Sequence, residues 1–254
     1  MKLFRITILL IILLFSAFYS KLQRLQSTAW VESLQVAIYP INADGHAKTS
    51  AYINRLSGDN FKSLERFFDK QWLNYSEFDF QPIAIELMPV IEGRPPEPPQ
   101  SGNIIKTMFW SLRLRFWAYQ NSLTSDKTTV NIFIQYQQFD EQQHLAHSLG
   151  LQKGLIGVVN AYAGQPYQET NNVVIAHELL HTVGASDKYD LQTGQPIYPE
   201  GFADPSANYN QLKAELMGGR VPSSATESEM PSSLRYCMIG DKTATEIGWV
   251  EINN

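Results

Sequence analysis

HELLHTVGASD, residues 177–187, is the stretch of this 254-residue chain that decides its fold. On an α-helix, residues four apart project from the same face about 5–6 Å apart, so His177 and His181 can hold one ion through their imidazole nitrogens. Glu178 lies one position round the helix, close enough to hold a water molecule on the ion without replacing it. The spacing therefore predicts a metal-binding helix with a general base beside the metal.

A third ligand is expected just beyond this helix. Gly184 can adopt a left-handed conformation that ends the helix and reverses the chain, which lets Asp187 approach the ion from the other side. Asp190 and Glu215 remain alternatives to Asp187 for the third position. Two histidines and one carboxylate suit Zn²⁺, and three protein ligands leave the fourth position for water, as in catalytic zinc sites.

The residues before the motif support a buried helix. Candidate N-caps are Thr170, Asn171 and Asn172. Apolar contacts for the helix are expected from Val173, Val174, Ile175, Leu179, Leu180 and Val183.

On these residues the chain resembles the metzincin-like zincins, in the variant pattern HExxHxxGxxD in which aspartate replaces the third histidine. The resemblance covers residues 177–187 and, more weakly, residues 214–219 (AELMGG), which look like the Met-turn beneath the metal. Met217 is favoured as the Met-turn methionine because a glycine pair suited to a tight turn follows it, and Met238 is its rival. The resemblance implies a zinc metallopeptidase.

The family also implies an active-site helix under a mixed sheet whose edge strand binds extended substrate, and we match that edge strand to residues 154–163. In one respect the chain departs from the family: Gly219 stands where many metzincins have a tyrosine, two residues after the Met-turn methionine. A tyrosine that stabilises the oxyanion must then come from elsewhere. The candidates are Tyr189, Tyr209 and Tyr236.

The expected reaction is hydrolysis of a peptide bond by metal-activated water, with Glu178 removing the proton and returning it to the departing amine. The expected partner is a peptide or protein substrate. Two alternatives stay open. One is a membrane-tethered, non-catalytic zinc-binding protein whose metal site is closed by a fourth protein ligand. The other is a zinc amidase that acts on cell-wall material.

The rest of the chain alternates strand and helix patterns, which predicts an α+β fold with a mixed β-sheet over the motif helix. Strands are expected from Leu34, at 82–90, at 129–136 and at 154–163, with helices at 59–74 and 104–119 and a proline-rich surface loop at 92–99. We expect a single zincin-like catalytic domain at 25–254. Its upper part runs to about residue 183, and its smaller, loop-rich lower part spans 184–254.

The predicted helix at 104–119 is unusual because it carries apolar residues on more than one face. One face holds Ile105, Met108, Phe109, Leu112 and Phe116, and another holds Trp110, Arg113 and Trp117. We expect the helix to pack on the sheet. The alternative is a membrane-facing or substrate-facing role for Trp110 and Trp117.

Residues 1–24 form a candidate leader. Lys2 and Arg5 precede an uncharged, largely apolar run at 6–19, which is typical of an export signal or a short signal anchor. Phe18 and Tyr19 interrupt the small-x-small pattern expected before a cleavage site, so we favour an anchor in the inner membrane with the domain in the periplasm, and secretion if the leader is cleaved. The leader is thus the expected contact with the membrane.

Charge and cysteine content exclude some classes of function. A net charge of −5, with no cluster of Lys and Arg, argues against nucleic-acid binding. Cys237 is the only cysteine, so no disulfide within the chain supports the fold. The oligomeric state is left open by the sequence.

Overall fold

A computed structural model describes the arrangement of the chain. It covers residues 27–99, 102–123, 129–142 and 145–250, together with residues 5–7, 10, 11, 14, 18, 21, 22 and 25. The expected leader at 1–24 therefore lies largely outside the described residues. Among the described residues, no helix combines the length and apolar character needed to cross a bilayer.

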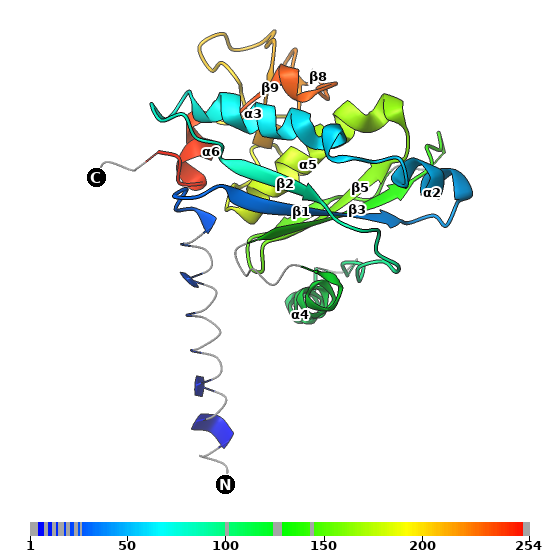
Figure 1. The fold of residues 1–254 in the computed structure, drawn as a ribbon. Coiled ribbons are helices and arrows are strands. Elements are labelled where there is room, and N and C mark those ends of the chain that lie inside the picture. Colours follow the sequence, from blue (N-terminus) through cyan, green and yellow to red (C-terminus); the bar gives the residue numbers. More distant parts are fainter. Residues whose placement is uncertain are drawn as a thin grey trace.

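A mixed five-stranded sheet forms the centre of the molecule, in the order β2-β1-β3-β5-β4 (Figure 1). Its strands are β1 (Leu34–Asn42), β2 (Ile83–Leu87), β3 (Val130–Gln137), β4 (Leu149–Leu151) and β5 (Ile156–Tyr162). Neighbouring strands run parallel except β4, which runs antiparallel to β5. The mixed sheet packed against helices confirms the coarse α+β prediction.

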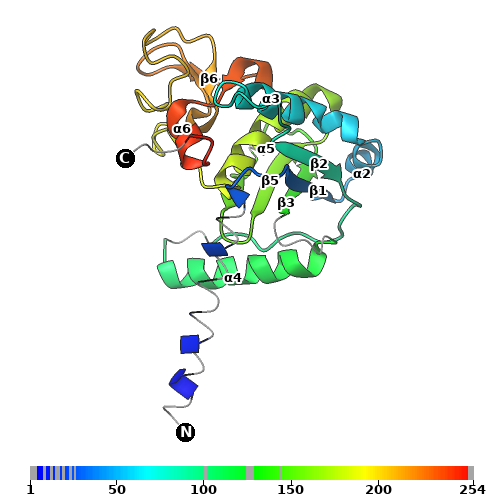
Figure 2. The same cartoon turned by 60° about the vertical axis from the view of Figure 1, so that its left-hand side comes forward.

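Helices cover both faces of this sheet, which explains why β1 and β3 are buried almost throughout. The helices before the metal motif are α2 (Ala47–Ile53), α3 (Lys62–Trp72), with the 3-10 turn η1 (Gly58–Phe61) ahead of it, and α4 (Ile104–Asn121). On one face, α3 and the motif helix α5 (Gln168–Thr182) pack over Val36, Ile38, Ile132 and Ile134. On the other, α4 packs over Tyr39, Phe133 and Val158 (Figure 2). Helix α2 was not predicted from the sequence.

Helix α5 begins at Gln168, two residues before the first of the expected N-caps and directly after the 3-10 turn η2 (Gln165–Tyr167). Asn171 and Asn172 therefore lie inside the helix, and the N-cap prediction for them and for Thr170 is wrong. Their side chains bind other segments instead. Asn171 donates to the Tyr162 carbonyl at 2.9 Å, and Asn172 donates to the Asn60 carbonyl at 2.9 Å. These bonds fix the helix against the sheet and against η1.

The end of α5 agrees with the prediction made for Gly184. This glycine has φ of +109°, and the amide of Ala185 donates to the Leu180 carbonyl at 3.0 Å. Such a backward hydrogen bond is typical of a glycine-terminated helix. The chain consequently turns back across the end of α5 instead of continuing away from it.

The edge strand beside the motif helix is β4, and our assignment of residues 154–163 to the edge is wrong. β5 pairs with β3 on one side and with β4 on the other, so it lies inside the sheet. The three residues of β4 were too short a segment for periodicity to reveal. Gly150, at the centre of β4, packs directly on the backbone of Glu178 and on the side chain of His181.

Helix α4 packs on the sheet, but its tryptophans face inwards. Trp117 makes an edge-on contact with Phe133, with ring centroids 4.9 Å apart, and Trp110 donates to the Pro96 carbonyl at 2.8 Å. Both tryptophans pack against the buried cluster on this face of the sheet. The alternative of a membrane-facing or substrate-facing role for them is wrong.

After α5 the chain forms loops and short elements that lie above the motif helix (Figure 2). They comprise β6 (Ala214–Glu215), η3 (Leu216–Gly218), β7 (Val221–Pro222), β8 (Ser228–Glu229), η4 (Leu234–Tyr236), β9 (Cys237–Met238) and α6 (Asp241–Glu246). β6 pairs with β9 and β7 pairs with β8. These small strands bring residues far apart in sequence next to the end of α5.

We predict that Gly150→Ala destabilises the protein by about 1–3 kcal/mol, the usual cost of overpacking a tight contact. An added Cβ would collide with the Glu178 carbonyl and with His181 Cβ, neither of which can rotate away. Urea denaturation of the purified protein measures the effect. Gly58→Ala is the matched control, because a Cβ at that position meets nothing within 4 Å. Equal losses of stability in the two variants would contradict the close packing of β4 on α5.

Candidate metal centre

Three side chains converge at the end of α5. His177 Nε2 and His181 Nε2 each lie 3.1 Å from Asp187 Oδ1, and the two nitrogens lie 3.1 Å from each other. Zinc bonds of about 2.0–2.2 Å place tetrahedral ligand atoms roughly 3.3–3.6 Å apart. The observed triangle is slightly tighter than that, so the three residues form a candidate metal-binding group.

The hydrogen bonds of the two Nδ1 atoms determine the tautomer of each imidazole, and so what each Nε2 atom presents to the centre of this triangle. His177 Nδ1 donates to the Leu216 carbonyl at 2.9 Å, and His181 Nδ1 donates to the Ala185 carbonyl at 2.8 Å. A carbonyl can only accept, so in the neutral rings both Nε2 atoms carry lone pairs. Two lone pairs and a carboxylate oxygen then face one another, and a shared cation relieves their repulsion. The donor set therefore fits a divalent metal ion.

Asp187 is held in its charged form. Burial disfavours the charge, but an imidazole that takes up a second proton donates its Nε2–H to Asp187, and this hydrogen bond from His177 or His181 outweighs burial and lowers the pKa of Asp187 well below its usual range. The same hydrogen bond, together with the charge of Glu178 and the bond to the Leu216 carbonyl, raises the pKa of His177 against the opposing effect of burial. Asp187 is therefore an anionic candidate ligand at neutral pH.

Glu178 lies beside the triangle and is almost fully buried, with 6% of its surface exposed. Burial raises the pKa of Glu178 above its ordinary value, although the nearby charges of His177 and His181 oppose the shift. Its Oε2 atom is buried and has no hydrogen-bond partner among the described residues. A buried carboxylate oxygen without a protein partner is costly unless a water or a substrate atom binds to it.

Neither rival for the third ligand position points at the histidines. Asp190 caps its own turn, where Oδ1 accepts from the amide of Thr193 at 2.8 Å. Glu215 is fully buried and accepts hydrogen bonds from Thr243 Oγ1 at 2.7 Å and from the Gly218 amide at 2.8 Å. Glu215 therefore ties η3 to α6, and of the three acids considered Asp187 is the one that meets the histidines.

The segment that resembles a Met-turn contacts one of the candidate ligands directly. Leu216 accepts the hydrogen bond of His177, and the Met217 carbonyl accepts the amide of Lys188 at 2.9 Å. Met217 itself is fully buried, whereas Met238 lies on β9, which pairs with β6. The segment thereby supports both a histidine and the loop that carries Asp187.

Of the three candidate tyrosines, Tyr189 is the one next to the triangle. Its ring centroid lies 6.2 Å from that of His177. Burial, together with the nearby charge of Asp187, raises the pKa of Tyr189 to about 12. Tyr209 packs on Phe202 instead, and Tyr236 lies half exposed in η4.

His147 also lies near the catalytic candidates. His144, three positions before it, lies outside the described residues. The charge of His147 acts on Glu178 and lowers the pKa of that carboxyl group. His147 precedes β4, so the edge strand brings it towards the end of α5. No sequence spacing links it to the motif.

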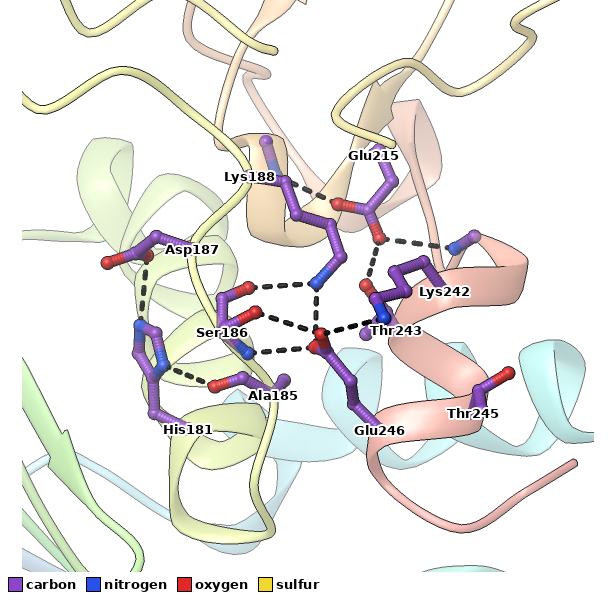
Figure 3. Close-up of polar contacts among 12 residues, drawn as sticks. His181, Ala185, Ser186, Asp187, Lys188, Glu215, Lys242, Thr243, Thr245 and Glu246 are labelled. Carbon is purple, nitrogen blue, oxygen red and sulfur yellow. Dashed lines mark hydrogen bonds and ion pairs between the residues drawn. The ribbon is translucent and has the colours of Figure 1, made fainter. Parts of the chain in front are cut away.

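A buried ion pair holds the loop that carries Asp187 (Figure 3). Lys188 Nζ lies 2.8 Å from Glu246 Oε2 on α6, and it also donates to the Ser186 carbonyl at 2.9 Å. Glu246 accepts from both the amide and the hydroxyl of Ser186, each at 2.9 Å. Both neighbours of Asp187 are thus fixed by one carboxylate. Sequence reasoning missed Glu246, which lies 60 positions after Ser186.

The pKa of Glu246 shows how strongly this pair is held. Burial disfavours its charge, yet hydrogen bonds from Lys188 and from Ser186 lower its pKa below the ordinary value. The contribution of this ion pair to the stability of the fold is therefore fully present above the pKa of glutamate in the unfolded chain. It is lost as the pH falls through the lower pKa that Glu246 has in the folded protein.

We predict that Glu246→Ala destabilises the protein by about 3 kcal/mol, because it leaves the buried Lys188 ammonium group without its carboxylate. It should also weaken metal binding, since the loop at 186–188 loses its fixed position. Denaturation and metal titration measure the two effects. Lys242→Ala is the control, because this exposed lysine contacts Glu246 only at 4.0 Å. An unchanged metal affinity in Glu246→Ala would refute the positioning role.

Comparison with known proteins assigns no family. No protein-family model matches the chain, and no curated protein matches it either. Among solved structures, one described as "Structure of a chaperone-substrate complex" aligns with 86% of this chain and 34% of that chain, at 11% sequence identity and a TM-score of 0.40. The chain thus spans about a third of that structure's chain, and a likeness this weak carries no argument about function.

Proposed function

We propose that the protein is a zinc-dependent metallopeptidase of the zincin type, with His177, His181 and Asp187 as the zinc ligands. The observation that carries the proposal is the combination of three converging acceptor atoms with a buried, unpartnered carboxylate oxygen of Glu178 beside them. A metal-storage or purely structural site has no need for such a carboxylate. A hydrolytic site needs one to move a proton.

In this proposal each residue has a separate role. Zinc, when bound, lowers the pKa of a water molecule and polarises the scissile carbonyl. Glu178 Oε2 accepts the proton of the attacking water and later delivers it to the departing amine. The raised pKa of Glu178 suits a group that must both accept and release a proton. The hydroxyl of Tyr189 donates to the oxygen on which negative charge develops.

Strand β4 is the proposed binding edge for an extended substrate. It is the terminal strand of the sheet and lies against Glu178 and His181 through Gly150. A peptide can add to such an edge by main-chain hydrogen bonds, which fixes its scissile bond relative to the neighbouring residues. This edge favours a peptide over the cell-wall amide that the sequence left open, because a short amide gains little from a strand edge.

The non-catalytic alternative requires a fourth protein ligand. Within the described part of the chain, the group of metal-ligating side chains contains three members. Three ligands leave a coordination position for water, so this count favours a catalytic site and argues against a closed structural site. Export and tethering through residues 1–24, facing the periplasm, remain part of the proposal.

Glu178→Gln should retain about one zinc per chain and lose nearly all peptidase activity, because an amide cannot accept the proton. Metal analysis and cleavage of a mixed peptide library, each with and without chelator, measure the two properties. His181→Ala should lose both zinc and activity, since it removes a ligand.

Glu86→Gln is the matched control for the charge change, because Glu86 is an exposed residue on β2 at the opposite edge of the sheet. It should retain full activity. An active Glu178→Gln variant would remove Glu178 from its role. Bound iron with redox activity, in place of zinc, would replace hydrolysis with oxidative chemistry.

Tyr189→Phe should lower kcat by about 10²–10³ and change KM much less, as expected on removal of one oxyanion donor. Steady-state kinetics on a cleaved peptide separate the two constants. Tyr209→Phe, which removes a hydroxyl from a ring packed on Phe202, should leave both unchanged. A fall in zinc content that accounts for the whole loss of activity would instead limit Tyr189 to supporting Asp187.

A further inference from the structure

The outward face of α4 is an unusually large apolar surface. Six of its side chains are between 54% and 79% exposed: Ile105, Met108, Phe109, Leu112, Phe116 and Tyr119. At the helical repeat of 3.6 residues they fall on one continuous stripe along the helix. Single exposed apolar residues are ordinary, but a contiguous stripe of this kind marks a surface that contacts another apolar phase.

This stripe cannot turn inwards, because the opposite side of α4 is fixed to the sheet. Leu114 and Ala118 are buried there, and Trp117 packs on Phe133. Trp110 donates to the Pro96 carbonyl, which fixes the helix to the proline-rich loop as well. Rotation of the helix would expose these residues and break that hydrogen bond.

The charges of α4 point to the chemistry of what covers the stripe. Lys106 and Arg113 border it on one side and Arg115 on the other, and the helix contains no Asp or Glu. The sequence carries no acid between Glu97 and Asp126. An apolar stripe bordered by cations complements the acyl chains and anionic headgroups of a phospholipid surface.

The described positions of the N-terminal segment lie on the same side of the sheet as α4 (Figures 1 and 2). Its described positions are helical and expose apolar side chains, among them Ile11, Leu14 and Phe18.

We propose that α4 is an interfacial helix, which inserts its outward stripe into the surface of a bilayer containing anionic phospholipid. The helix lies on one face of the sheet and α5 on the other. Docking through α4 therefore keeps the end of α5 clear of the lipid, where His177, His181 and Asp187 stay open to water. The inference is independent of the metal that these residues bind.

A fluorescent probe on the stripe tests the proposal in the full-length chain. Leu112→Cys can be labelled with an environment-sensitive fluorophore, because the only native cysteine, Cys237, is buried. The protein is reconstituted into vesicles of phosphatidylcholine and phosphatidylglycerol that carry doxyl groups on their acyl chains. Leu212→Cys is the matched control, because this leucine is 88% exposed and lies two residues before β6, which is on the other side of the sheet from α4 (Figure 2).

The expected result is that the doxyl lipids quench the emission of the probe at position 112 and leave the emission of the probe at position 212 unchanged. Because the two proteins share the same N-terminal segment, a difference between them cannot come from that segment. Equal quenching by the doxyl lipids at both positions would overturn the proposal. A blue shift at position 112 without quenching by the doxyl lipids would also overturn it, since it would assign the stripe to a protein partner such as a second copy of the chain.

Charge reversal tests the requirement for anionic lipid. With the probe at position 112, Lys106→Glu combined with Arg113→Glu should reduce the quenching in vesicles that contain phosphatidylglycerol. The matched control, Lys213→Glu combined with Arg235→Glu, reverses two exposed cations outside α4 and should leave the quenching unchanged. Equal quenching in both double variants would contradict the role of the α4 cations.

Discussion

The mutual repulsion of three acceptor atoms is the constraint on which the rest of the site depends. Two imidazole nitrogens and a carboxylate oxygen meet at 3.1 Å because their other contacts leave them no alternative. Each imidazole is fixed by a backbone carbonyl, and the loop of Asp187 is fixed by α6. Such an arrangement is costly without a cation and favourable with one, so in the proposed function metal binding would stabilise this part of the fold.

The surrounding fold supports this convergence from three directions. β4 packs on the last turns of α5 through Gly150, η3 lies beneath His177, and α6 supplies Glu246 to the loop after the helix. Buried polar residues serve the same end. Glu215, buried throughout, joins η3 to α6 by accepting hydrogen bonds from both, so the two supports of the metal site are linked to each other.

The sheet separates two surfaces of opposite character. One face carries α5 and the polar groups that approach the metal ligands, and the other carries α4 with its exposed apolar stripe. A surface that contacts lipid cannot also carry chemistry that depends on water, since lipid excludes water. In the arrangement that we propose, contact with lipid through α4 leaves the candidate site on the opposite face accessible to substrates in solution.

The sequence by itself determined the local geometry: the relation of His177, Glu178 and His181 follows from the helical repeat, and the helix end follows from Gly184. It also predicted the mixed sheet. Tertiary structure alone decided between Asp187 and Glu215, because only the fold shows that Glu215 is already satisfied by hydrogen bonds. It likewise decided that β4 is the edge strand and which face of α4 packs. A helical spacing is fixed over a few residues, whereas strand order and the partner of an apolar face depend on contacts between distant segments.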